Sequence, residues 1–126
     1  MTDVHLRILI LDDDPMFLRA LARKLRAEGH AVTALSDPTL FFEPGGADLV
    51  ADVDVAILDL EMGAHDMVAL GETMTELVDV VFHSGTGDAA LRRRAERIAT
   101  LTSKGEGAAL MAWLGRVAEK KGRTRR

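Results

Sequence analysis

Residues Leu6 to Pro15 read LRILILDDDP, an aliphatic run that stops abruptly at three carboxylates. The run is rich in branched side chains, which is typical of a strand that is buried on both faces of a sheet. Asp14 suits the cap of a helix and Pro15 suits its first position, so a helix is expected to begin directly after the carboxylates. The segment therefore predicts a buried strand, an acidic strand end and a helix in immediate succession.

Strand and helix patterns continue to alternate along the rest of the chain. Gly29 should end the first helix, and Pro44 to Gly46 should end a short, irregular helix that begins at Asp37 and Pro38. Further strands are expected over residues 30–35, 55–58, 78–82 and 99–102, and further helices over 67–77, 88–98 and 106–120. Residues 47–53 fit either a helical turn or a loop. Alternation of this kind predicts a single α/β domain, a doubly wound parallel sheet of five strands with helices on both faces.

Length and composition limit the classes of protein to which the chain can belong. Its 126 residues suit one domain, expected over 1–120, followed by a basic tail over 121–126. Cysteine is absent, which excludes disulfides, thiolate metal sites and thiol nucleophiles. The net charge of −4 argues against nucleic acid as the main partner. No apolar run reaches the roughly 20 residues that span a bilayer, and the first residues lack a secretion signal, so a cytoplasmic protein without membrane contact is expected.

The polar residues that follow the predicted strands carry the functional argument. In open parallel sheets, ligands bind outside the carboxyl ends of the strands. The side chains expected there are Asp12, Asp13, Asp59, Ser84 and Lys104. These residues should therefore meet at one edge of the sheet.

Carboxylates that converge in this way need a cation. Two of them at 4 Å repel each other by about 4 kcal/mol at an effective dielectric constant near 20. A hard divalent ion such as Mg²⁺ offsets this repulsion through oxygen ligands, and Lys104 adds a second positive charge. A carboxylate held between two cations can act as a nucleophile toward phosphorus, with Ser84 as a hydrogen-bond donor to a phosphoryl oxygen. The set therefore predicts phosphoryl chemistry on an aspartate.

Four short segments, in order, resemble the signature motifs of the receiver domains of response regulators in two-component signalling. They are LILDDDP (9–15), LDLEM (58–62), FHSG (82–85) and TSKG (102–105). The resemblance implies that Asp12, Asp13 and the main-chain carbonyl of Glu61 hold Mg²⁺ or Mn²⁺ together with Asp59, and that Asp59 accepts the phosphoryl group. Ser84 and Lys104 would then bind the phosphoryl oxygens.

The same resemblance implies a flavodoxin-like sheet of strand order 2-1-3-4-5. It implies a single-domain phosphoprotein that receives its phosphoryl group from a histidine kinase or a histidine phosphotransfer protein and then presents a switched surface to a downstream protein. Such a chain catalyses only its own phosphorylation and dephosphorylation, and it is expected to be a monomer or a weak dimer.

Four positions depart from the pattern of the family. Gly63 and Gly105 stand where receivers usually have proline, which predicts looser loops, and Met67 replaces a glycine after Asp66. Leu101 stands where many receivers carry a switch aromatic, so the surface rearrangement of relatives cannot be assumed for this chain.

Two other functions remain open at this level. The departures are compatible with a degenerate receiver that binds proteins without being phosphorylated. A phosphatase with an aspartate nucleophile is a further hypothesis, because Asp14 lies two residues beyond Asp12, but 126 residues leave no room for the substrate-covering cap that this chemistry generally requires. His83 should pack or be solvated instead of acting as a base for Ser84, since adjacent strand residues point to opposite faces. His5, His30 and His65 receive no role.

Overall fold

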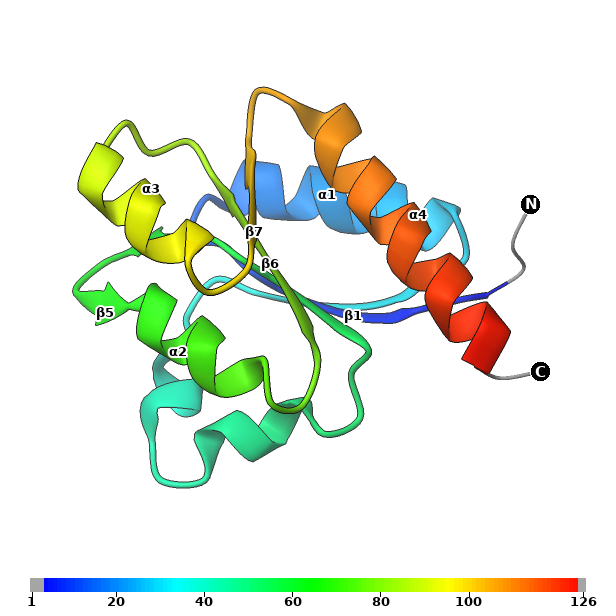
Figure 1. The fold of residues 1–126 in the computed structure, drawn as a ribbon, viewed down its shortest axis with the longest axis horizontal. Helices are drawn as coiled ribbons and strands as arrows, with labels where there is room; N and C mark the ends of the chain where they lie inside the picture. Colours follow the sequence, from blue (N-terminus) through cyan, green and yellow to red (C-terminus); the bar gives the residue numbers. More distant parts are fainter. Residues whose placement is uncertain (1–3, 125–126) are drawn as a thin grey trace.

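A computed structural model describes residues 4–124, and within them a five-stranded parallel sheet forms the centre of the molecule (Figure 1). Its strands are β1 (Arg7–Leu11), β2 (Ala31–Leu35), β3 (Val55–Leu58), β6 (Asp79–Ser84) and β7 (Thr100–Ser103). The spatial order is β2-β1-β3-β6-β7. Two very short strands, β4 (Glu61–Met62) and β5 (His65–Asp66), pair only with each other. The expected order 2-1-3-4-5 is therefore confirmed.

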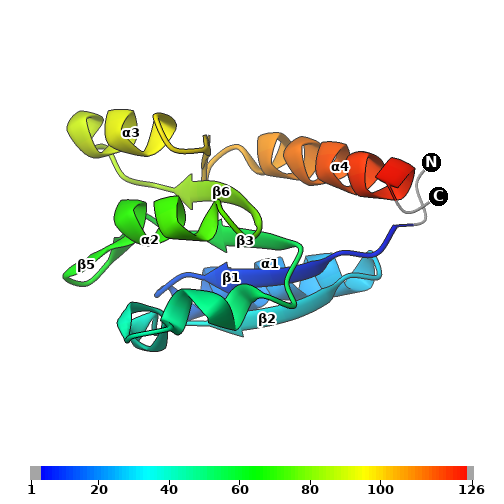
Figure 2. The same ribbon diagram turned by 60° about the horizontal axis from the view of Figure 1, so that its bottom comes forward.

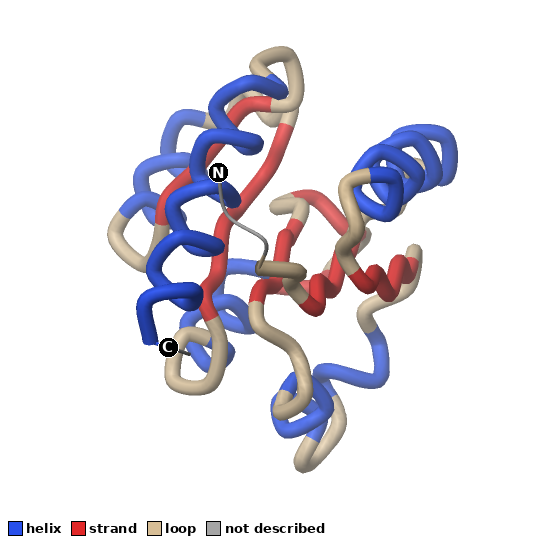
Figure 3. Tube along the Cα trace, turned by 90° about the vertical axis from the view of Figure 1, so that its right-hand side faces the viewer, coloured by secondary structure: helices blue, strands red, loops and turns tan. Residues whose placement is uncertain are grey.

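Helices cover both faces of the sheet (Figure 3). One face packs against α1 (Pro15–Ala27) and α4 (Gly107–Thr124), and the other packs against α2 (Met67–Met74) and α3 (Ala89–Glu96). Two 3₁₀ segments, η1 (Thr39–Phe42) and η2 (Gly46–Val50), lie on the side of α2. One apolar cluster lies between the sheet and each of the two helical layers.

Alternation along β1 explains why the sheet separates these clusters. Ile8 and Ile10 point toward α1 and α4, whereas Leu9 and Leu11 point toward α2 and the 3₁₀ segments, and all four are at most 2% exposed. On the second face, Gly71 of α2 lies so close to the ring of Phe82 that an added Cβ would stand 2.5 Å from it. The sheet is thus buried on both sides, as the aliphatic runs indicate.

The structure differs from the sequence predictions at several element ends. The region 39–50 forms two 3₁₀ segments because Pro44 and the left-handed Gly45, with φ of 76°, interrupt any longer helix. The strand β6 continues to Ser84, and α2 ends at Met74 instead of at residue 77. The helix α4 extends to Thr124, so residues 121–124 of the expected tail are helical, while 125 and 126 lie outside the described residues. Within 4–124, no helix has both the length and the apolar character needed to cross a membrane.

Candidate functional site

Three carboxylates gather at the carboxyl ends of β1 and β3. Ligand oxygens of Asp12, Asp13 and Asp59 all lie within 4.8 Å of one another. The register that pairs Leu11 with Leu58 places Asp12 and Asp59 next to each other, each one residue beyond its strand. Asp12 is 2% exposed and Asp59 is 5% exposed, whereas Asp13 faces solvent. The predicted meeting of these three residues is confirmed.

Lys104 brings a cation to the two buried members of this cluster. Its Nζ lies 2.9 Å from Oδ2 of Asp12 and 3.1 Å from Oδ2 of Asp59. The lysine follows β7, and its backbone N–H donates to the carbonyl of Ser84 at 3.0 Å, so the backbone at the end of β6 fixes its position. The ammonium also lies 4.8 Å from the centre of the Phe17 ring, in cation–π contact. A single side chain therefore bridges the ends of β1 and β3.

Burial and charge together set the ionisation of the two partners. Burial raises the pKa of Asp59, the nearby charge of Asp12 raises it further, and Lys104 opposes both effects. Burial lowers the pKa of Lys104, but its hydrogen bond to Asp12 and the charge of Asp59 outweigh burial and leave that pKa raised. Lys104 is thus held as an ammonium.

Ser84 and Thr86 form a turn at the end of β6. Ser84 is fully buried, and its Oγ accepts the backbone N–H of Thr86 at 3.1 Å. The hydroxyl of Thr86 accepts in turn from the N–H of Asp88, which caps α3. The described contacts join Ser84 to Lys104 through the backbone, and the role of the Ser84 hydroxyl stays a prediction.

Glu61 lies at the exposed start of β4. Its backbone N–H donates to Oδ1 of Asp59 at 3.4 Å, so this residue helps to orient the carboxylate. Its expected role as a main-chain metal ligand stays a prediction.

The hairpin formed by β4 and β5 is an element that the sequence analysis missed. Its turn contains Gly63 with φ of 65°, a conformation closed to proline, which accounts for the glycine at this position. The ring of His65 stacks on Phe42 with centroids 4.8 Å apart. Asp66 caps α2 and pairs with Arg94 of α3. A two-residue turn that begins with glycine is the sequence signal that could have revealed it.

Asp14 is committed to capping. Its carboxylate accepts the backbone N–H groups of Met16 and Phe17 at the start of α1, as predicted. Its side chain is therefore engaged at the helix terminus, which disfavours the phosphatase hypothesis that needs this residue as an acid or base.

His83 packs in the core, as its place in the strand predicts. It is 2% exposed, and its Nδ1 lies 2.6 Å from Oγ1 of Thr102. Because the Thr102 hydroxyl donates its proton to the carbonyl of Phe82, it accepts from Nδ1, which therefore carries the hydrogen. Burial lowers the pKa of His83, and the charge of Lys104 adds to this effect.

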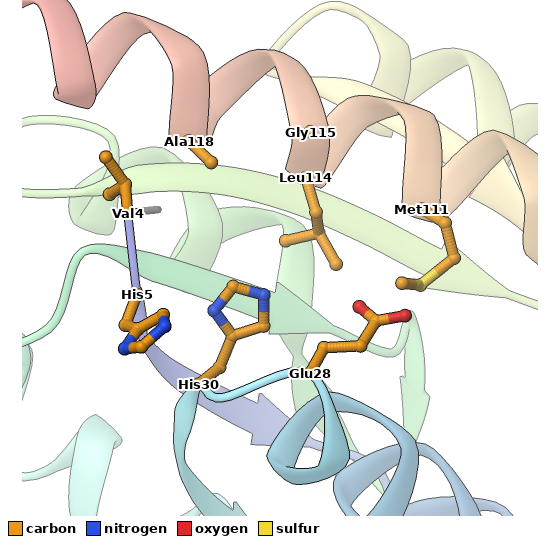
Figure 4. Close-up of a pocket in the computed structure, with 8 residues that line it drawn as sticks. All are labelled: Val4, His5, Glu28, His30, Met111, Leu114, Gly115 and Ala118. Atoms are coloured by element: carbon orange, nitrogen blue, oxygen red, sulfur yellow. The ribbon is translucent and has the colours of Figure 1, made fainter. Parts of the chain in front are cut away.

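His5 and His30 lie at the opposite end of the sheet, where the strands begin. They line a pocket of about 260 Å³ together with Glu28 and with residues of α4 (Figure 4). Nδ1 of His30 accepts the backbone N–H of Leu6 at 3.0 Å, so its proton resides on Nε2. This contact joins the start of β1 to the end of the α1–β2 connection.

The acidic cluster fits a divalent metal in its chemistry. Three carboxylates from two neighbouring strands offer the oxygen ligands that Mg²⁺ and Mn²⁺ prefer. Exposed Asp13 leaves one side of the cluster open to water or to a phosphoryl group. The residues present are therefore able to hold such an ion.

Comparison with known proteins identifies the fold. The signal receiver domain of an HD domain-containing protein from Pseudomonas fluorescens gives a TM-score of 0.77 at 19% identity, covering 99% of this chain and 95% of that one. A CheY-like response regulator receiver domain protein from Methanospirillum hungatei gives 0.74 at 19% identity, with coverage of 94% and 99%. The BeF3-activated DrrB receiver domain gives 0.72 at 18% identity, with coverage of 91% and 98%. No protein-family model and no curated protein matches the sequence.

Proposed function

We propose that this chain is a response-regulator receiver domain in which Asp59 accepts a phosphoryl group and thereby switches a protein-binding surface. The fold is that of receiver domains, which supports this assignment. The observation that carries the proposal is the bridge from Lys104 to both Asp12 and Asp59 at the carboxyl edge of the sheet. The phosphoryl donor would be a histidine kinase or a histidine phosphotransfer protein. The protein would act in the cytoplasm.

The charges at the site suit the transfer of a phosphoryl group from a phosphohistidine to Asp59. One Oδ of Asp59 attacks phosphorus as the P–N bond of the phosphohistidine breaks, and the electron pair leaves with the imidazole nitrogen, which takes up a proton. Lys104 neutralises charge on an equatorial phosphoryl oxygen, and Ser84 donates a hydrogen bond to another. Asp12, Asp13, Asp59 and the Glu61 carbonyl would hold Mg²⁺ or Mn²⁺, which supplies further charge neutralisation when bound.

Beryllofluoride, a mimic of the phosphoryl group, tests the acceptor role without a kinase. With Mg²⁺ present, its addition should shift the amide resonances of residues near Asp59, Ser84 and Lys104 in a ¹⁵N-edited NMR spectrum. The Asp59→Asn variant should not respond, whereas Asp48→Asn, at an exposed aspartate of η2, should respond as the wild type does. An unchanged wild-type spectrum would favour the alternative of a degenerate receiver that acts without phosphorylation.

A further inference from the structure

The charges of this chain are divided along the sequence in an unusual way. Between Arg26 and Arg92 there is no lysine or arginine, and thirteen aspartates and glutamates lie in that interval. It contains β2, both 3₁₀ segments, β3, the β4–β5 hairpin, α2 and β6. One continuous half of the chain is therefore acidic, with only histidines as possible cations.

Exposed apolar side chains lie on the same part of the molecule. Leu40 is 59% exposed, Leu49 57% and Phe42 40%. All three belong to η1 and η2, which lie outside the sheet next to α2 (Figures 1 and 2). Three acidic side chains are exposed nearby. Asp48 lies in η2, Glu43 directly follows η1, and Asp52 lies two residues after η2. We call this surface, made by Leu40, Phe42 and Leu49 with Glu43, Asp48 and Asp52, the η face.

The local fold explains why these side chains face outward. Each 3₁₀ segment is only four or five residues long and buries one large apolar side chain, Phe41 in η1 and Val50 in η2. Residues of a 3₁₀ segment that are three apart share a face, so Leu40, Phe42 and Leu49, each next to one of these buried residues, point in other directions. Leu40 also borders a hollow of about 260 Å³ that Leu35 and Thr39 help to line. The surface therefore combines apolar groups, a depression and negative charge, a combination that marks an interaction site.

We propose that the η face docks a basic amphipathic segment of a partner protein. The partner's apolar side chains would cover Leu40, Phe42 and Leu49, while its lysines and arginines would lie against Glu43, Asp48 and Asp52. Nucleic acids and anionic membranes are repelled by this charge. A second copy could offer the basic side chains of α1 or α4, but contact between two unlike faces would build a ring or an open polymer, which the sedimentation of the free protein would reveal.

A contact already described connects the η face to the carboxyl edge of the sheet. Phe42 stacks on His65, and His65 belongs to the hairpin whose other strand begins with Glu61, two residues after Asp59. The docking proposal does not depend on phosphorylation, because the surface is exposed in the structure as it stands. It can therefore fail while the proposed function holds, and the reverse is equally possible.

A synthetic 14-residue leucine–lysine helix serves as the probe, with the matching leucine–glutamate peptide as its control. Fluorescence anisotropy should show that the lysine peptide binds and that the glutamate peptide does not. Added salt should weaken the binding of the lysine peptide. The Leu40→Ser/Leu49→Ser variant and the Glu43→Gln/Asp48→Asn/Asp52→Asn variant should each bind it at least tenfold more weakly. Met16→Ser, which changes an exposed apolar residue of α1 on the other face, should leave the affinity unchanged, as should Asp59→Asn.

The substituted side chains are exposed, so each variant is expected to fold. An unchanged thermal unfolding temperature will show that it does. Amide shifts confined to residues 37–52 on titration with the lysine peptide would support the proposal. It would be overturned by absence of binding, by equal binding of the glutamate peptide, or by an affinity that the η-face variants do not lower. Salt-sensitive self-association that disappears in Leu40→Ser/Leu49→Ser would also overturn it, because the occupant would then be a second copy.

Discussion

Lys104 shows how one residue can hold a site together before any ligand arrives. Two buried carboxylates on adjacent strands repel each other, and the ammonium group between them compensates for that repulsion. Such a buried arrangement contributes little net stability, but removal of its cation leaves charges without a partner. The same ammonium is correctly placed to meet an anion that approaches Asp59.

Burial of His83 should make the stability of the domain depend on pH. Because burial holds its pKa below the value in the unfolded chain, the folded state keeps this imidazole neutral while the unfolded state binds a proton near pH 6.5. Its contribution is fully present above that pH, and below it the free energy of unfolding should fall by up to about 1.4 kcal/mol per pH unit. Urea unfolding of the wild type and of His83→Gln between pH 8 and pH 5 measures the effect.

The His83→Gln variant should lose only part of this pH dependence. The remainder comes from His30, whose pKa is also lowered by burial. Comparison at pH 8 separates any loss of packing from the titration. If the two proteins showed parallel pH profiles, the neutral form of His83 would not be the source of the dependence.

Individual residues differ in how far the sequence could predict them. Asp12, Asp59 and Lys104 follow directly from the ends of buried strands, because parallel strands must bring their carboxyl ends to one edge. The roles of Ser84 and Glu61 depend on the direction of a hydroxyl group and of a carbonyl group. No periodicity in the sequence encodes these directions, and both roles remain predictions.

At the level of elements, Gly63 allows the tight turn that joins β4 to β5. Its φ of 65° lies in the left-handed region, and an added Cβ would meet nothing within 4 Å. Gly63→Ala should therefore destabilise the domain by about 1 kcal/mol through backbone strain alone. Gly87 is the matched control, since it has equal space and no positive φ.

Gly87→Ala should leave the free energy of unfolding unchanged or raise it by about 0.5 kcal/mol, since alanine restricts the unfolded chain. Urea unfolding of both variants gives the comparison. Equal effects of the two substitutions would show that the turn is not strained by a side chain at residue 63.

The five strands of the main sheet and the four α-helices could be predicted because runs of apolar residues mark the strands and helical spacing of apolar residues marks the helices. The division of 39–50 into two 3₁₀ segments and the two-residue strands of the hairpin were missed, because no repeating apolar pattern marks them and they depend on contacts such as that of His65 with Phe42. The extension of α4 to Thr124 was missed for a different reason. Basic residues suit both the last turns of a helix and a solvated tail.

At the scale of the whole molecule, the two proposed functions lie on two separate surfaces. The carboxyl edge of the sheet holds the acidic cluster and Lys104, and the η face presents apolar and acidic side chains beside α2. Two residues of the β4–β5 hairpin contact these surfaces. Glu61 donates a hydrogen bond to Asp59 at the carboxyl edge, and His65 stacks on Phe42 of the η face. Phosphorylation and partner docking can therefore be measured separately in one protein.

The intact mass of the protein after incubation with acetyl phosphate and Mg²⁺ tests the central claim most directly. The wild-type chain should gain the mass of one phosphoryl group, and it should gain none when the metal is removed by a chelator. Asp59→Asn should remain unmodified under the same conditions. A wild-type mass that does not change, or an addition that persists in Asp59→Asn, would contradict the assignment of Asp59 as the acceptor.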